Sequence, residues 1–151
     1  MHEFQEIENA VIAALEPLKL EGIRTIEPYG GQLDNQNEIE LMAAQMDVFP
    51  FIYCMAGGLE SAQVNLADEI GSTVVLVIAD RNQRGADYAV RGDSASPGVY
   101  RILERVKQLL NRQMVITGWK PLVREREYPV IYKPAEGLCV YMAVYRAVKR
   151  A

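Results

Sequence analysis

One apolar run constrains the fold more than any other feature of the sequence. Residues 72–79 read STVVLVIA, so that β-branched and aliphatic side chains follow one another with no polar residue after Thr73. A strand that is apolar on both faces is typical of the inside of a sheet that is covered on both sides. The run is also far shorter than the ~20 apolar residues of a membrane-spanning helix. We therefore expect a central strand here and no membrane segment.

Two amphipathic helices are predicted on either side of this strand. In residues 4–18 the apolar side chains recur at helical spacing, and Pro17 and Gly22 indicate where this helix ends. A second helix is predicted after Ser96, which is suited to be its N-cap, with Pro97 at the first helical position. The apolar face of this second helix consists of Val99, Ile102, Leu103, Val106, Leu109 and Leu110.

Shorter segments complete the predicted sheet. We expect strands at residues 23–29, 47–55, 114–117, 122–126, 130–132 and 138–148. Pro50 places the second of these at an edge or a bulge, and Gly57 and Gly58 are expected to end it, with a polar connection over residues 59–71. Residues 38–45 read as a short helix, after a loop that begins at Gly30.

The order of these elements predicts an α+β fold. Clustered strands interrupted by two main helices indicate a mostly antiparallel or mixed sheet with both helices packed on one face. The chain has no internal repeat and no linker, so we expect a single domain over residues 1–151. Residues 81–98 are expected to form a long polar loop, and loops of this length are usually functional or disordered.

Charge is divided unequally between the two halves of the sequence. Residues 1–80 carry 14 acidic and 2 basic residues, a net charge of −12, whereas residues 81–151 carry 6 acidic and 14 basic residues, a net charge of +8. Such asymmetry indicates charged partners. The halves could neutralise each other within the fold, form opposite faces that meet head to tail in a ring, or bind nucleic acid through the basic half. No nucleic-acid recognition motif accompanies the basic residues.

Few residues are suited to catalysis. His2 is the only histidine and lies at the N-terminus, which argues against catalytic triads and histidine-rich metal sites. Cys54 and Cys139 lie far apart within apolar runs, so we expect buried, reduced thiols. Asp34, Glu38 and Glu40 lie close in sequence, and Asp80 and Asp93 flank the long loop. Such carboxylates could bind Mg²⁺, although their spacing does not require it. We expect no catalytic residue, no metal and no cofactor; a small carboxylate- or metal-dependent enzyme is the alternative.

Three motifs resemble segments of one protein family. They are EPYGGQLD at residues 27–34, VIADRNQRG at residues 77–85 and RGDSASPGVYRILE at residues 91–104. Their order is similar to that in a family of small virion proteins from Mu-like contractile-tailed phages and prophages. The surroundings of Trp119 and the last strand also fit, so that the resemblance covers nearly the whole chain. Gly30 stands where the family has a proline, a departure that concerns the turn.

The resemblance implies a fold similar to that of lambda-type tail terminators. Those subunits form a six-fold ring on the last disc of the tail tube, stop the growth of tube and sheath, and present a surface to the head. It therefore implies a protein of the virion tail that is assembled in the host cytoplasm. The implied partners are further copies of the chain in a hexameric ring, the tube and sheath proteins, and a head-completion or neck protein. DNA would only pass through the lumen. Another neck or head–tail connector protein is the alternative.

The resemblance also directs attention to the polar loop as a contact with a neighbouring subunit or the tail tube. Arg81, Arg84 and Arg91 are expected to reach carboxylates of a neighbour, because a guanidinium group can bind a carboxylate through two hydrogen bonds. Asp93 in the same loop is included in this predicted interface.

Two tyrosines of the last predicted strand are further candidates for this interface. Tyr141 and Tyr145 share one face of the strand, because side chains alternate between faces. That face either packs under a helix or contacts a partner, and tyrosine is common in subunit interfaces.

Overall fold

A computed structural model of the chain describes residues 1–30, 48–64, 67–82, 84–94 and 96–150. The helical segments of this part are α1 (Glu3–Leu15), η1 (Glu16–Glu21), α3 (Ala86–Arg91), α4 (Val99–Leu110) and η3 (Pro134–Glu136). The strands are β1 (Thr25–Pro28), β2 (Phe51–Val64), β3 (Ala67–Arg81), β4 (Val123–Lys133) and β5 (Leu138–Arg150).

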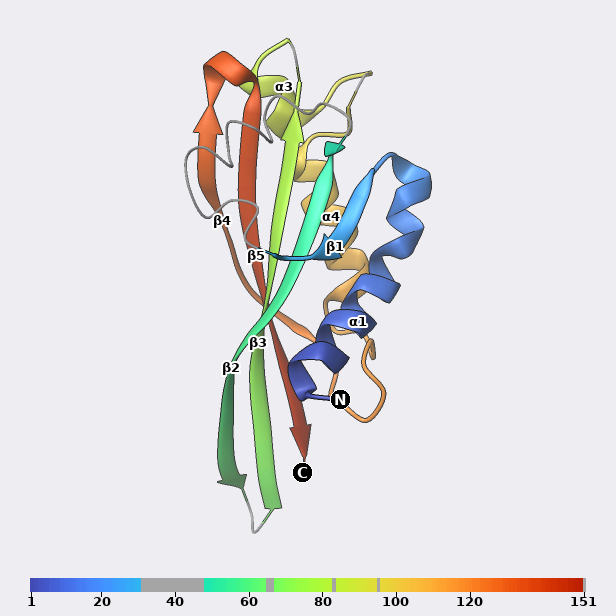
Figure 1. The fold of residues 1–151 in the computed structure, drawn as a ribbon, viewed down its shortest axis with the longest axis vertical. Helices are drawn as coiled ribbons and strands as arrows, with labels where there is room; N and C mark the ends of the chain where they lie inside the picture. Colours follow the sequence, from blue (N-terminus) through green and yellow to red (C-terminus); the bar gives the residue numbers. More distant parts are fainter. Residues whose placement is uncertain (31–47, 65–66, 83, 95, 151) are drawn as a thin grey trace.

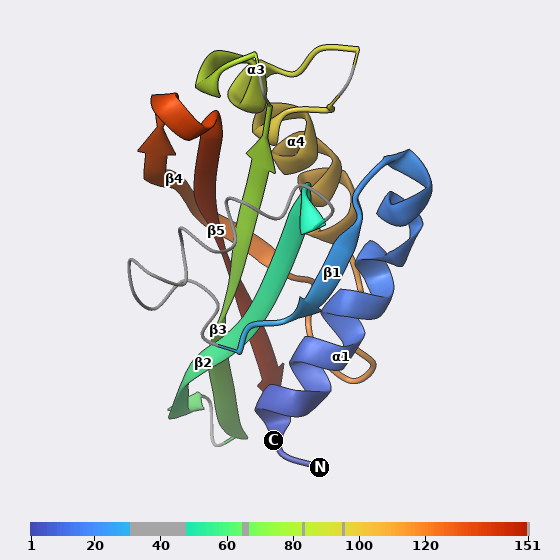
Figure 2. The same ribbon diagram turned by 45° about the horizontal axis from the view of Figure 1, so that its top comes forward.

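The five strands form one sheet in the order β1-β2-β3-β5-β4 (Figure 1). β1 runs parallel to β2, and the remaining neighbours are antiparallel. The two longer helices, α1 and α4, lie on the same face of this sheet, as Figures 1 and 2 show from two directions. The predicted α+β fold, a mixed sheet with two main helices on one face, is therefore confirmed.

Strand β3 is central, as its unbroken apolar sequence predicted. Val74, Leu76 and Ile78 are fully buried beneath the helices, and they belong to a core that also contains the apolar residues of α1 and α4. Val77 and Ala79 point to the other face, where they pack in a second, smaller cluster with residues of β2 and β5. Burial on both faces explains why this strand has no polar alternation.

Both main helices were predicted, but the start of α4 was not. α1 ends at Leu15, and the 3₁₀ turn η1 that contains Pro17 follows it and ends at Gly22, which has a φ of 100°. α4 begins at Val99 with Gly98 as its N-cap, so Pro97 is not a helical residue. The Ser96 hydroxyl does not cap α4, because it accepts a hydrogen bond from the Asn82 side chain (Nδ2–Oγ 3.0 Å).

The predicted strand boundaries need three corrections. β2 does not end at Gly57, because a bulge between Gly57 and Leu59 absorbs the glycines and pairing with β3 continues to Val64. Pro50 lies immediately before β2, whose first residues pair with strands on both sides, so it marks no edge strand. Residues 114–117 form no strand.

Two further predictions differ from the structure in part. The separate strands expected at residues 122–126 and 130–132 form the single strand β4, which contains two register shifts opposite β5. The predicted 81–98 loop contains the helix α3. The loop and short helix expected between residues 31 and 45 lie outside the described residues.

Tyr145 offers a direct test of the packing between β5 and the helices. Its side chain has no exposed surface, and its hydroxyl has no hydrogen-bond partner in the described part of the chain. Burial also raises the pKa of Tyr145. Since an unpaired buried polar group costs about 1–3 kcal/mol, we expect Tyr145→Phe to raise the free energy of unfolding by about 1 kcal/mol in urea titrations.

The matched control is Tyr141→Phe, which removes the hydroxyl of a partly exposed ring on the same strand face. We expect this control to change the free energy of unfolding by less than about 0.5 kcal/mol. Destabilisation by Tyr145→Phe would contradict this description of the core.

Candidate functional site at the end of the central strand

Three segments that are distant in sequence meet where β3 ends. The Gly98 N–H donates to Asp80 Oδ2 (2.9 Å), which joins the start of α4 to the end of β3. The Asn82 N–H donates to the Gly137 carbonyl (3.0 Å), which adds the turn that precedes β5. The residues of this loop cluster are Asp80, Arg81, Asn82, Arg84, Gly92, Asp93, Ser96, Gly98 and Gly137.

Two glycines allow the loop cluster to close. Gly92 and Gly98 have φ values of 85° and 81°, in the region that favours glycine. A Cβ atom on Gly98 would collide with the backbone nitrogen of Gly92, and one on Gly92 would collide with the carbonyl oxygen of Pro97. The glycines of the 91–104 motif are therefore required by backbone contact, independently of any ligand.

Asp80 is the buried polar centre of the loop cluster. The Asp80 side chain has no exposed surface; Oδ1 accepts from the Arg81 N–H (2.7 Å) and Oδ2 from the Gly98 N–H. Burial raises the pKa of Asp80 to about 6, although both backbone donors and Ser96 lower it. The sequence offered Asp80 only as one of several carboxylates that could bind Mg²⁺, and not as the polar centre of a loop cluster. The available signal was a carboxylate that directly follows a fully apolar strand.

The three arginines predicted to contact a neighbour differ in their intrachain partners. Arg84 pairs with Asp93 of its own chain (Nη1–Oδ2 3.3 Å) and lies over the Tyr88 ring at 4.3 Å. The Arg81 Nε–H donates to the Glu136 carbonyl (2.8 Å). Arg91 is exposed and makes no side-chain hydrogen bond or ion pair with the described residues. Of these three arginines, only Arg91 is thus without a side-chain hydrogen bond or ion pair to the described residues.

The two predicted tyrosines have different surroundings. Tyr141 contacts Tyr100 edge-on (ring centroids 5.9 Å apart), and the two hydroxyl oxygens lie 3.5 Å apart. The hydrogen bond with Tyr100 raises the pKa of Tyr141 to about 12. Tyr100 is half exposed, so this pair reaches the surface between α4 and β5. Tyr145 is entirely buried, and the packing role is the one the structure supports for it.

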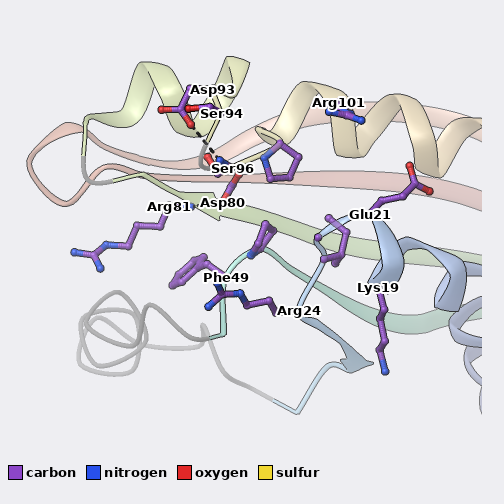
Figure 3. A pocket seen from close by; sticks show the side chains of 14 residues that line it. Lys19, Glu21, Arg24, Phe49, Asp80, Arg81, Asp93, Ser94, Ser96 and Arg101 are labelled. Carbon is purple, nitrogen blue, oxygen red and sulfur yellow. Dashed lines mark hydrogen bonds between the residues drawn. The ribbon is translucent and has the colours of Figure 1, made fainter.

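A charged cleft of about 670 Å³ adjoins the loop cluster (Figure 3). One wall comes from the turn between η1 and β1, and the opposite wall comes from Asp93, Ser94, Ser96, Pro97 and Arg101 of α4. Phe49 and Pro50, which precede β2, also line it. These segments are not neighbours in sequence, so no local pattern could have predicted the cleft.

The described residues show no arrangement suited to catalysis. Cys54 and Cys139 are buried free thiols, and burial raises their pKa values to about 12 and about 11, so both remain protonated near neutral pH. The His2 Nδ1 accepts the Phe4 N–H (3.1 Å) as the N-cap of α1. Within the described residues no group of three or more potential metal ligands occurs. No described helix is both long and apolar enough to cross a bilayer.

The charge division of the sequence is partly neutralised within the fold. Arg105 binds both carboxylate oxygens of Glu21 (2.8 Å each), and Lys120 pairs with Glu69 (3.2 Å). Each pair joins the basic half to the acidic half. The sheet order nevertheless keeps the halves apart, because β1, β2 and β3 lie together and β5 and β4 follow on the other side. Part of the charge division is therefore neutralised inside the fold, while the strands of the two halves lie on opposite sides of the sheet.

Comparisons with known proteins point to phages. The family model described as "Bacteriophage Mu, Gp37" matches residues 3–147. A chain of the solved structure "Virion of native gene transfer agent (GTA) particle" has a similar fold, with a TM-score of 0.57 and 14% identity over 95% of this chain and 94% of that chain. At this identity the likeness concerns the fold alone. No curated protein matches the chain.

Substitution of Gly98 tests whether backbone contact closes the loop cluster. Gly98→Ala should reduce the free energy of unfolding by at least about 2 kcal/mol more than Gly118→Ala, because overpacking adds to the conformational strain. Gly118 is a matched control: its φ is 83°, but a Cβ atom there would meet nothing within 4 Å. Urea unfolding measures both variants. Equal losses would show that the Gly92–Gly98 contact does not constrain the fold.

The pH dependence of stability tests the burial of Asp80. Its pKa is raised from 3.8 to about 6 in the fold, so the folded state binds more protons than the unfolded state between these values. Protonation of Asp80 therefore stabilises the fold, and this contribution falls as pH rises. The free energy of unfolding of the wild type minus that of Asp80→Asn should consequently decrease from pH 4 to pH 7.

Asp87→Asn is the control for this measurement, because Asp87 is an exposed residue of α3. The difference between wild type and Asp87→Asn should vary less with pH than the difference for Asp80→Asn. A difference for Asp80→Asn that is constant or grows with pH would contradict the assigned shift.

Proposed function

We propose that this chain, which belongs to the bacteriophage Mu Gp37 family, is a tail terminator of a Mu-like contractile-tailed phage. A structural virion protein is the function class that its family supports, and its fold is shared with a chain of a gene transfer agent virion. The finer assignment rests on the motifs at residues 27–34, 77–85 and 91–104, which resemble those of tail terminators.

The observation that carries the proposal is the loop cluster, which the second and third motifs form together. In this cluster the Asp80 carboxylate accepts two backbone N–H groups, and further hydrogen bonds join backbone groups of the three segments. In the described residues this arrangement leaves no reactive group poised for chemistry, and it presents Arg91 and the Arg84–Tyr88 pair at the surface. Such a platform is suited to protein contact, where arginine and tyrosine are enriched.

A ring also gives the separated charges a role. In a closed ring each subunit contacts its neighbours through two different patches, one on each side. The strands of the acidic half lie on one side of the sheet and those of the basic half on the other. We propose that the acidic side of one copy meets the basic side of the next copy, so that charge complementarity sets the orientation of subunits in the ring.

The proposed partners follow from this position. Copies of the chain form a hexameric ring at the head-proximal end of the tail, one face of the ring contacts tube and sheath proteins, and the other contacts a head-completion or neck protein. DNA passes through the lumen without specific binding. Assembly takes place in the host cytoplasm.

Arg91 provides the test of the contact between subunits. Arg91→Glu should prevent ring formation and leave the monomer folded, because this exposed side chain makes no side-chain hydrogen bond or ion pair with the described part of its own chain. Arg84→Glu is a poorer test, since it would place a second carboxylate beside Asp93. Arg112→Glu, also at an exposed arginine but outside the loop cluster, is the control. Sedimentation velocity and negative-stain images measure assembly, and circular dichroism measures folding.

The wild type should form a closed six-fold ring, alone or when purified headless tails are added. A stable two-fold dimer would argue against the terminator, because a self-complementary patch cannot close a six-fold ring. If Arg91→Glu forms rings that are as stable as those of the wild type, the loop cluster is excluded from the contact between subunits. Binding to heads and not to headless tails would favour a neck protein.

A further inference from the structure

The charged cleft has features that the terminator role does not explain. Three guanidinium groups line it from three separate elements: Arg24 precedes β1, Arg81 ends β3 and Arg101 lies in α4. Figure 3 shows Arg81 extending toward the left of the view, Arg24 ending beside Phe49, and Arg101 on α4 above them. These arginines come from distant parts of the sequence. The fold brings them to one cleft, and no run of like charges along the chain accounts for it.

The guanidinium groups of these arginines keep hydrogen-bond donors unused inside the described structure, although Arg101 acts on Glu21 through its charge. The side chains of Arg24 and Arg101 make no hydrogen bond or ion pair with the described residues. Arg81 uses its Nε–H for the Glu136 carbonyl, which leaves its two terminal nitrogens available. The cleft therefore offers several N–H donors of fixed charge to a ligand.

The carboxylates that line the cleft already have other partners. Glu21 is held by Arg105 through both oxygens, and this hydrogen bonding lowers the pKa of Glu21. Asp80 is buried and accepts two backbone N–H groups, and Asp93 pairs with Arg84. Glu21 attracts Arg101 through charge, but none of these carboxylates makes a hydrogen bond or ion pair with Arg24 or Arg101.

Apolar side chains lie between the charged ones. Ile23, Phe49, Pro50 and Pro97 contribute to the lining, so that the cleft alternates apolar surface with guanidinium groups. A guanidinium group binds a carboxylate through two parallel hydrogen bonds, and an apolar side chain gains free energy by leaving water. An extended peptide that carries both kinds of side chain matches this lining.

We propose that the cleft binds an extended acidic segment of a partner protein. Carboxylates of that segment bind Arg24, Arg81 and Arg101, and an apolar side chain between them packs on Phe49 and Pro97. Nucleic acid is the less suitable ligand, because no nucleic-acid recognition motif accompanies the basic residues. The inference requires neither a ring nor a position on the tail, so it stands or fails separately from the terminator assignment.

Fluorescence anisotropy with the full chain tests this inference. The probe is a labelled octapeptide of alternating glutamate and leucine, and its partner probe has glutamine in place of each glutamate. The glutamate peptide should bind, with affinity that falls as salt is added, and the glutamine peptide should bind at least about tenfold more weakly. Equal binding of the two peptides, or no binding of the glutamate peptide, would overturn the proposal.

Substitutions then locate the binding site. Arg24→Glu combined with Arg101→Glu should weaken binding of the glutamate peptide by at least about tenfold, whereas Arg112→Glu should change it by less than about twofold. If the double reversal fails to fold, Arg24→Gln with Arg101→Gln carries the same expectation in weaker form. Unchanged affinity in a folded double variant would overturn the proposal. Tighter binding of a single-stranded oligonucleotide than of the glutamate peptide would also overturn it, in favour of a nucleic-acid site.

Discussion

The hydrogen bonds of Asp80 fix the relation between the sheet and the helix layer at the end of β3. The Asp80 carboxylate accepts the N–H of Arg81, the last residue of β3, and the N–H of Gly98, the N-cap of α4, which lies 18 positions after Asp80. This pair of bonds brings Gly98 onto Gly92 and sets where α4 starts, and α4 in turn carries Arg101 and Tyr100 to their places. The candidate interface and the charged cleft therefore both depend on a single buried carboxylate, whose desolvation cost is only partly offset by its two backbone donors.

Buried and exposed polar groups have different surroundings in this fold. Buried groups such as Asp80, Cys54 and Tyr145 serve packing or backbone pairing, whereas exposed groups such as Arg91 and Tyr100 are those typical of protein contacts. The ion pairs Glu21–Arg105 and Glu69–Lys120 show that part of the charge division serves the fold itself. In the proposed ring, the charges that are not paired within the chain are available to a neighbouring subunit.

Local periodicity predicted the parts of the fold that local sequence controls. The central strand and both amphipathic helices were found because their burial patterns repeat along the chain, at the periods of a strand or a helix. Predictions were wrong where a distant residue decides: Asp80 takes part in capping α4 in place of Ser96, and pairing with β3 carries β2 through Gly57 and Gly58. The arginines were chosen by their loop, but only the structure shows that Arg84 is paired within its own chain. The charged cleft was not predicted because its walls are brought together only by the fold.

The length of the tails measures the central claim most directly. A phage or prophage that lacks this chain should be induced, and the tails in its lysate should be imaged by negative stain and compared with those of the complemented strain. A terminator predicts headless tails of uneven length, many of them longer than normal, and a return to uniform length on complementation. Headless tails of normal, uniform length would contradict the terminator and would indicate a protein that acts after the tail is complete.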